Sequence, residues 1–325
     1  MKLKLLAPLA LVLLAACDGN PLGTTDVPVC DTNCPVGADD PVTIPPILAK
    51  NLQAIAYDQT SDSFRITFKS LDTTPTIATW NRRAALDLVG YRAYVVQEDP
   101  LDRMFVGLAK TSTDGSVTAI AAGDGGQFNR VFQGGTYGRT GGFDRPTSTD
   151  GAGSGQVSYA GTYAAVTNIG APRPGEILPV PPNTSGELVP DQPSRVRGDI
   201  FINANFTDNS VNGAIYNRVL VEANNFGLQA VILVPTDIEA NGTFTGTTER
   251  WVNDDPSMTT TGDYGGVFGG VDSAAVGGVV ALTKLYRTDT GALLPNALEQ
   301  GVFVLQQCGT AGDAAICSQV APTNP

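Results

Sequence analysis

A cysteine at the end of a short leader is the first residue whose position predicts chemistry. Two lysines within the first four residues form a basic start, Leu5–Leu14 is apolar, and small residues lead directly to Cys17. This order is typical of a secretory signal peptide, and Leu14-Ala15-Ala16-Cys17 matches a bacterial lipobox. We predict a signal peptide at residues 1–16 and lipidation of Cys17, with an ordinary secretory signal as the alternative. The leader is too short to span a membrane stably.

The remaining four cysteines lie in two local pairs, Cys30 with Cys34 and Cys308 with Cys317. A lipoprotein signal directs the chain to an oxidising compartment, so both pairs are predicted to form small disulfide loops. The alternative is a metal site of four thiolates. It is disfavoured because its halves lie far apart in the sequence and no histidine is present to complete either half.

The chain contains no histidine at all. This excludes Ser-His-Asp and Cys-His catalysis, and it excludes zinc or haem held by histidine. No other grouping of nucleophile, base and orienting residue can be assembled from the sequence. We therefore predict that the protein is not an enzyme, with no catalytic residues, no metal ligands and no cofactor.

Two polar segments are candidates for ligand binding. Gly170–Ser194 is a long loop with seven prolines, and long loops on rigid scaffolds often carry recognition. In Trp251–Pro256 an aromatic ring and two adjacent acids meet at a turn. The alternatives are a disordered excursion for the first and an ordinary Asp-Pro turn for the second. The binding-loop candidates are Glu176, Glu187, Asp191, Trp251, Asp254 and Asp255.

Polar, motif-like residues also occur in the N-terminal half, at Asp102-Arg103 and Asp124–Arg130. A ligand-contacting loop is one interpretation of the second stretch. The favoured interpretation is a glycine-led turn whose Asp and Asn side chains bond their own backbone. Asp114-Gly115 has the form of a tight hairpin turn.

Acidic residues dominate the charge. The chain has 20 Lys and Arg against 32 Asp and Glu, and losing Lys2 and Lys4 with the leader takes the formal charge from −12 to −14. This balance disfavours nucleic acid and anionic lipid as partners. Acidity of this kind usually serves solubility, and a basic ligand is its less common cause.

The chain is long enough for about two domains after the leader. Residues 17–47 are rich in Gly, Pro, Asp and Thr, which predicts a flexible tether behind the lipidated cysteine. Residues 48–150 contain strand-like segments such as Phe64–Phe68 and Tyr91–Val96, which predicts a small β-rich domain. Thr79–Leu88 within it is predicted to form one short helix, capped by its threonine.

Residues 151–325 change to strand-length segments separated by turn residues. Ile200, Ile202 and Phe206 alternate with more polar neighbours, so one face of each strand should be core and the other mostly wet. Eight strands enclose an interior that side chains can fill, and closure removes exposed edges. The predicted strands are Gln156–Asn168, Arg197–Thr207, Asn212–Ala223, Leu228–Asp237, Asn241–Trp251, Gly262–Gly270, Ala275–Arg287 and Gly301–Gln307.

The predicted fold class is therefore mainly β, with a C-terminal eight-stranded antiparallel β-barrel preceded by a small β-rich, handle-like domain. A membrane-embedded barrel is the alternative. It is disfavoured because the face opposite the apolar one carries Asn, Thr and charged residues. Glycines are concentrated in the sixth and seventh predicted strands, where they permit sharp coiling and close approach of strands.

A family resemblance rests on these glycines. The strand Tyr264-Gly265-Gly266-Val267-Phe268-Gly269-Gly270 is followed, after a short connection, by Ala274-Ala275-Val276-Gly277-Gly278-Val279. This pattern resembles transferrin-binding protein B-like surface lipoproteins, whose barrels have such strands late in the chain beside a strand-rich handle. Earlier strands agree at Gly161-Thr162-Tyr163, Gly198-Asp199-Ile200 and Gly242–Gly246. True transferrin receptors have two lobes of handle plus barrel, so the resemblance implies one such lobe here and does not extend to transferrin itself.

These features predict a lipid-anchored, non-enzymatic binding lipoprotein of the bacterial envelope. As the resemblance implies, loops at one end of the barrel would bind a host or environmental protein, or an iron- or haem-bearing ligand. The lipid makes the membrane a partner, and the outer-membrane surface is favoured over the periplasmic face of the inner membrane. Asp18, directly after the lipidated cysteine, leaves the choice of membrane open. The alternative function is a structural envelope lipoprotein without a specific ligand.

Overall fold

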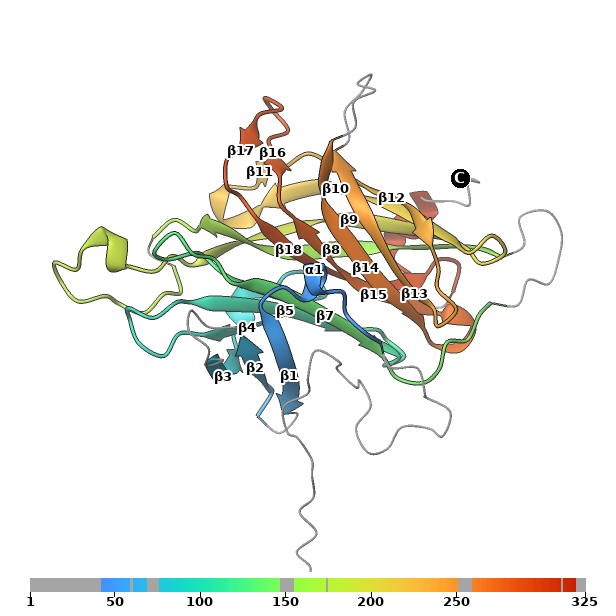
Figure 1. The fold of residues 1–325 in the computed structure, drawn as a ribbon, viewed down its shortest axis with the longest axis horizontal. Helices are drawn as coiled ribbons and strands as arrows, with labels where there is room; N and C mark the ends of the chain where they lie inside the picture. The colour runs from blue at the N-terminus through green and yellow to red at the C-terminus, as the bar shows by residue number, and fades with distance from the viewer. Residues whose placement is uncertain are drawn as a thin grey trace, which may run out of the picture.

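A computed structural model describes residues 42–58, 61–68, 76–146, 155–173, 175–250, 259–310 and 312–319. Two β-sheets dominate it, a seven-stranded sheet and a closed barrel, and a third sheet has two short strands (Figure 1). None of the described helices is long and apolar enough to cross a membrane. The helical segments are α1 (Pro46–Ala49) and the 3₁₀ turns η1 (Ala84–Leu86), η2 (Gly186–Leu188), η3 (Val221–Ala223), η4 (Val271–Ser273) and η5 (Ala315–Gln319).

The N-terminal sheet, which we call the handle, is a meander in which every strand pairs antiparallel with the next. One face of this curled sheet encloses an aromatic core that includes Phe64, Phe68, Trp80 and Tyr94. The strands are β1 (Leu52–Asp58), β2 (Ser63–Phe68), β3 (Thr76–Arg82), β4 (Arg92–Val96), β5 (Phe105–Thr111), β6 (Val117–Asp124) and β7 (Gln133–Arg139).

The helix predicted over Thr79–Leu88 is wrong. β3 pairs with β2 as far as Asn81, and only Ala84–Leu86 forms a single 3₁₀ turn. Trp80 explains the difference, because its side chain is only 1% exposed and stacks on Phe68 with ring centroids 5.7 Å apart. Burial of this ring in a strand outweighs the modest helix propensity of the neighbouring alanines.

The predicted eight-stranded barrel is confirmed. Each long strand pairs antiparallel with the next, and the last, β18, pairs with the first, β8, to close the wall. The wall consists of β8 (Gln156–Gly170), β9 (Pro193–Asn205), β10 (Ser210–Leu220), β12 (Val231–Asp237), β13 (Thr243–Arg250), β14 (Thr260–Gly269), β15 (Ala275–Leu282) and β18 (Glu299–Gln307). The predicted seventh strand is divided, since β15 ends at Leu282 and β16 (Leu285–Tyr286) follows within the predicted range. Two short strands were not predicted: β11 (Phe226–Gly227) and β17 (Leu293–Leu294).

Side chains fill the barrel interior. Ile200, Ile202 and Phe206 point into this core, as their alternation predicted, and are at most 2% exposed. Aromatic rings occupy the middle, with Phe268 between Phe206 and Phe244 at centroid distances of 5.0 and 5.2 Å. The closed wall therefore encloses a packed core.

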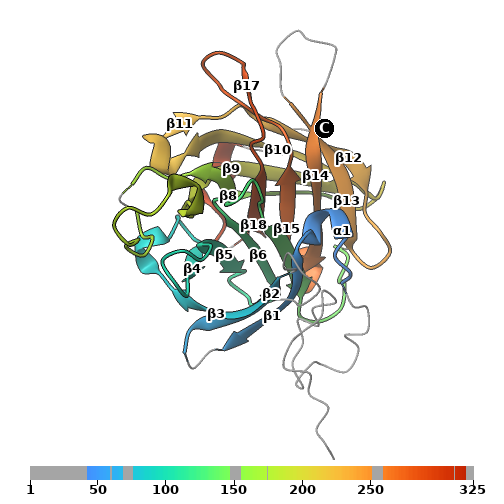
Figure 2. The ribbon, with the colours of Figure 1, turned by 60° about the vertical axis from the view of Figure 1, so that its left-hand side comes forward.

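The handle packs against the outer wall of the barrel along β8, β14, β15 and β18 (Figures 1 and 2). Ala164, Val279 and Val302 on this wall are completely buried, so the expectation of a mostly wet outer face is wrong for these strands. Glycines of the Gly-rich strands, among them Gly269, face the handle or α1. A Cβ atom at Gly277 would lie 2.4 Å from Cγ1 of Val117, and one at Gly265 would lie 2.7 Å from Cδ1 of Leu48. Close approach of the two sheets therefore requires glycine at both positions.

The start of the described chain also belongs to this interface. Val42 and Ile44, in the predicted tether, are 5% and 4% exposed and pack with Leu48 of α1 in the same cluster as the handle and barrel side chains. The N-terminal segment thus lies between the two sheets at this point. The domain boundaries given above remain predictions.

Candidate functional site

The loop between β8 and β9 (residues 171–192), which we call the β8–β9 loop, carries three of the six binding-loop candidates. It leaves the barrel wall and runs beside β4 and β5 of the handle, where it is coloured yellow-green in both ribbon views (Figures 1 and 2). The Leu178 N–H donates to Oε1 of Gln97 at 2.7 Å, and the Gln127 side chain donates to the Leu188 carbonyl at 2.8 Å. The loop is therefore folded against the handle at both its start and its end.

Glu176 connects the beginning of this loop to the handle and to the loop's own end. Its Oε2 lies 2.8 Å from Nε of Arg83 on the handle, and its N–H donates to Oε1 of Gln192 at 2.6 Å. The Arg83 and Glu176 side chains are 47% and 33% exposed. The solvent screens a pair of this exposure, so the ion pair orients the loop and contributes little stability.

A groove of about 700 Å³ lies between this part of the loop and the handle. Its wall combines arginines, acids and apolar side chains, and Ile77 in it is 43% exposed. Such a mixture is typical of protein interfaces. The lining residues are Arg65, Ile77, Ala78, Thr79, Asn81, Arg82, Arg83, Val95, Val96, Gln97, Glu98, Met104, Glu176 and Leu178.

Hydrogen bonds and charges of the handle hold Arg82 at the edge of this groove. Arg82 donates from Nη1 and Nη2 to the carboxylate of Asp87, at 2.6 and 2.5 Å. On its other side, Nε of Arg82 lies 3.8 Å from Asp62. Hydroxyl hydrogen bonds from Tyr57 and Tyr94 lower the pKa of Asp62, and so keep that carboxylate charged.

A second groove of about 800 Å³ lies at the end of the loop, where Glu187 and Asp191 line it. Asp191 is paired with Arg173 across the loop, with Nη2 and Oδ1 3.2 Å apart. The opposite wall is the connection between β6 and β7, residues 125–131. The structure thus brings two candidates, Glu187 and Asp191, to one groove and leaves Glu176 at the other.

The β6–β7 connection is the turn that the sequence favoured for Asp124–Arg130, and it is held by a buried carboxylate. Asp124 is 1% exposed, accepts the Phe132 N–H at 2.9 Å and is paired with Arg103. Burial raises the pKa of Asp124, although the Phe132 N–H and the Arg103 guanidinium act in the opposite direction. The sequence singled out Asp102-Arg103 and Asp124 separately but did not place them together, because 21 residues separate Arg103 and Asp124.

A buried charge pair inside the barrel escaped the sequence reasoning entirely. Nη2 of Arg218 lies 2.6 Å from Oε2 of Glu299, and these residues are 2% and 0% exposed. The hydroxyl of Tyr163 donates to the other carboxylate oxygen at 2.7 Å. The cluster is buried inside the barrel, where it joins β8, β10 and β18. Only knowledge of strand pairing could have found it, since 81 residues separate the two charges.

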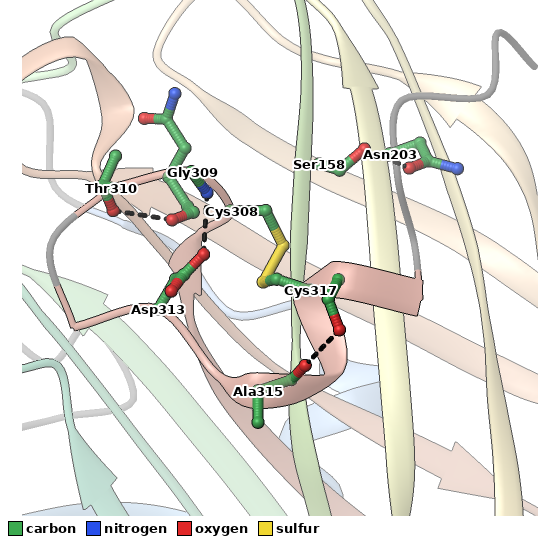
Figure 3. The surroundings of a disulfide bond; sticks show 10 residues. Ser158, Asn203, Cys308, Gly309, Thr310, Asp313, Ala315 and Cys317 are labelled. Carbon is green, nitrogen blue, oxygen red and sulfur yellow. Dashed lines mark hydrogen bonds between the residues drawn. A yellow bond between two sulfur atoms is a disulfide. The ribbon is translucent and has the colours of Figure 1, made fainter.

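The other predicted residues are distributed as follows. Trp251, Asp254 and Asp255 lie outside the described residues, as do Cys17, Cys30 and Cys34. Cys308 and Cys317 form a disulfide that ties η5 to the end of β18, with their Cα atoms 5.4 Å apart (Figure 3). Within the described ranges, no group of three or more Cys, Asp or Glu could hold a metal ion.

Comparison of this chain with known proteins finds similarity only to solved structures, at low sequence identity and low TM-score. No protein-family model matches it, and no curated protein matches it. Among solved structures, transferrin-binding protein B of Haemophilus parasuis Hp5 is similar over 83% of this chain, with 13% identity and a TM-score of 0.37. Intact Ap-TbpB with N and C lobes is 12% identical over 79%, with a TM-score of 0.35. The isotype 1 protein of serogroup B Neisseria meningitidis is 10% identical over 78%, with a TM-score of 0.30.

This chain spans about half the length of those structures, at 46%, 46% and 50% respectively. Its own strands form one seven-stranded sheet packed on one closed eight-stranded barrel. That is the single handle-plus-barrel lobe that the sequence resemblance implied. The described residues therefore form one lobe of the sheet-and-barrel class, with a folded loop at one end of the barrel.

Proposed function

We propose that this chain is a lipid-anchored, non-enzymatic binding protein of the bacterial cell envelope, displayed on the outer-membrane surface. Its ligand docks where the β8–β9 loop meets the handle. The observation that carries the proposal is this loop, which packs on the handle with a groove on each side. A protein ligand is favoured, because the grooves expose charged and apolar side chains together, and an iron- or haem-bearing ligand is the alternative.

The loop suits recognition because it is already ordered by its own contacts. Gln97 and Gln127 of the handle each bond to a backbone group of the loop, and Gln192 bonds to a third. Bonds of this kind fix the positions of the groove walls before a ligand arrives. A preorganised surface loses less conformational entropy on binding than a loose one, and this raises affinity.

The lipid anchor has its own test in cells. Replacement of Cys17 by alanine should abolish incorporation of radiolabelled palmitate and release the protein from membranes. The wild-type chain should be labelled and sediment with the outer membrane. Label in the alanine variant, or wild-type protein that stays in the soluble fraction, would contradict the anchor.

Display and binding are tested with intact cells and with the mature lipidated chain in detergent. Protease added to whole cells should degrade the protein if it is on the surface, whereas a periplasmic protein is protected. The detergent-solubilised chain should retain a specific protein from host serum or environmental extracts. A variant in which Gly-Ser residues replace residues 175–190 should retain less of it while giving the same circular dichroism. If neither chain retains anything specifically, a structural envelope lipoprotein is the better description.

A further inference from the structure

The turn between β6 and β7 holds an aromatic residue in a backbone conformation that aromatic residues avoid. Gln127 and Arg130 exchange two backbone hydrogen bonds, at 3.1 and 3.0 Å, around Phe128 and Asn129. Both central residues have positive φ, 52° for Phe128 and 54° for Asn129. A two-residue turn of this kind favours Asn or Gly at each position. Asn129 follows that rule, and Phe128 breaks it.

Phe128 does not serve the core, because its side chain is 55% exposed. Residues that break a local rule are concentrated at functional sites, where the surrounding structure holds them in place. Here the holding group is Arg103. It donates to the Arg130 carbonyl at 2.8 Å and to the Gln127 carbonyl at 2.6 Å, and Asp124 neutralises its charge. The exposed ring is thus presented on a rigid turn.

The neighbouring residue, Gln127, brings two further exposed apolar residues to this place. Its buried side-chain amide donates to the carbonyls of Leu101 at 2.9 Å and Leu188 at 2.8 Å. The Leu101 and Leu188 side chains are 36% and 39% exposed. The main chains of three segments distant in sequence, the β4–β5 connection, the β6–β7 turn and the β8–β9 loop, therefore meet at one amide group, and each segment carries an exposed apolar residue at this point. We call Leu101, Phe128 and Leu188 the Phe128 patch.

The rim of the Phe128 patch is acidic. Three exposed carboxylates, Asp99, Asp102 and Glu187, lie within two residues of Leu101 or Leu188 in the sequence, and within the described ranges none of them forms an ion pair. Two ion pairs, Arg173 with Asp191 and Arg103 with Asp124, cancel, and Arg130 is the remaining cation of these segments. Three unpaired acids against one arginine leave a local charge of −2.

We propose that the Phe128 patch is an anchor for a basic partner protein, which inserts an apolar side chain flanked by Lys or Arg. The apolar centre would supply most of the affinity, as buried aromatic residues do in protein interfaces. The acidic rim would select a cationic partner and accelerate its association. This inference rests on the proposed function and adds to it the contact residues and the partner's charge.

The test uses the mature lipidated chain in detergent and a random peptide display library as the probe. Peptides selected on the wild-type chain should carry an apolar residue next to Lys or Arg. Phe128→Asn should weaken the binding of these peptides about tenfold or more. Asparagine suits the turn, so this variant keeps the fold. Val271→Asn is the matched control, since Val271 is 76% exposed on the barrel, and it should bind like the wild type.

The possible outcomes separate the two proposals. Peptides that bind wild type and Phe128→Asn equally, or selected peptides rich in Asp and Glu, would overturn the Phe128 patch and leave the proposed function standing. A wild-type chain that retains neither peptides nor any protein from the extracts would contradict both. Raising the salt concentration from low to physiological should weaken the binding of the basic peptides, because salt screens the exposed charges of the rim. Salt-independent binding would contradict the role of the acidic rim.

Discussion

A methyl group at Gly277 should push the handle and the barrel apart. The Cβ atom of Gly277→Ala would lie 2.4 Å from Cγ1 of Val117, where ordinary carbon contacts are about 3.5–4.0 Å. One side must therefore move by about 1.1 Å or more. Gly277 lies in a barrel strand that is paired on both sides, and Val117 is completely buried at the start of β6, so neither can move freely. We expect a loss of about 2–3 kcal/mol in the free energy of unfolding.

Shortening Val117 tests whether this contact is the cause. Val117→Ala alone removes two buried methyl groups and should cost about 2 kcal/mol, including the cavity that remains. In the Val117→Ala background, the nearest remaining atom to a new Cβ at Gly277 is Cγ2 of Val304 at 3.3 Å. The added methyl then fits and partly fills the cavity. The double variant should be more stable than the sum of the single losses predicts, by about 2 kcal/mol.

Urea denaturation of the mature chain measures these differences. Circular dichroism follows both sheets. In a Trp251→Phe background, the fluorescence of Trp80, buried in the handle core, reports on the handle. Gly186→Ala is the control, because a Cβ there meets nothing within 4 Å, and it should change stability by less than about 0.5 kcal/mol. If Gly277→Ala costs the same with Val117 or Ala at position 117, the steric explanation is refuted.

Three other changes have expected outcomes. Burial lowers the pKa of Lys50 to about 8. The unfolded chain binds the Lys50 proton more tightly than the folded chain, so the free energy of unfolding should rise between about pH 8 and pH 10. Lys50→Met should remove this pH dependence of the urea midpoint and stabilise the protein at pH 7 by about 1–3 kcal/mol. Glu299→Gln leaves the Arg218 guanidinium buried without its carboxylate partner. It should lower the free energy of unfolding by about 3–5 kcal/mol in the same assay. A loss below about 1 kcal/mol would contradict this and indicate that water solvates Arg218 in the variant. Replacing Cys308 and Cys317 by serine opens a short loop, with a sequence separation of 9, and should cost about 2.5 kcal/mol, with no further loss on adding reductant.

The barrel strands were predictable because their pattern is local. Ile200 and Ile202 alternate with polar neighbours, and this period of two needs no knowledge of the partner strand. The turns between these strands contain Asn, Asp and Gly, which mark hairpins within a few residues. The pairing of Cys308 with Cys317 was predictable for the same reason, since the two residues are close in sequence.

The handle was less predictable, because distant contacts decide its structure. Local propensity favoured a helix around Ala84 and Ala85, yet Trp80 is drawn into a strand by Phe68 and by Phe105. Propensities are worth a few tenths of a kcal/mol per residue, whereas burying an aromatic side chain is worth a few kcal/mol. Burial of the Trp80 ring depends on residues that the local sequence does not contain.

The candidate site divides in the same way. Glu176, Glu187 and Asp191 were found from the length and composition of their loop. The partners of that loop, Arg83 and Gln127, were not, because a salt bridge or hydrogen bond over about 60 or more residues leaves no periodic signal. The same holds for Arg218 and Glu299 inside the barrel.

The sequence alone therefore determined the β class, the barrel strands, the Cys308–Cys317 pair and the loop that carries the candidate site. The tertiary structure decided that the handle covers one wall of the barrel, that Gly265 and Gly277 serve this contact, and that the β8–β9 loop folds onto the handle beside Phe128. The physical reason is the distance along the sequence over which each kind of interaction acts. Hydrophobic periodicity and turn chemistry act over a few residues, whereas burial, close approach and ion pairing join residues that only the folded chain brings together.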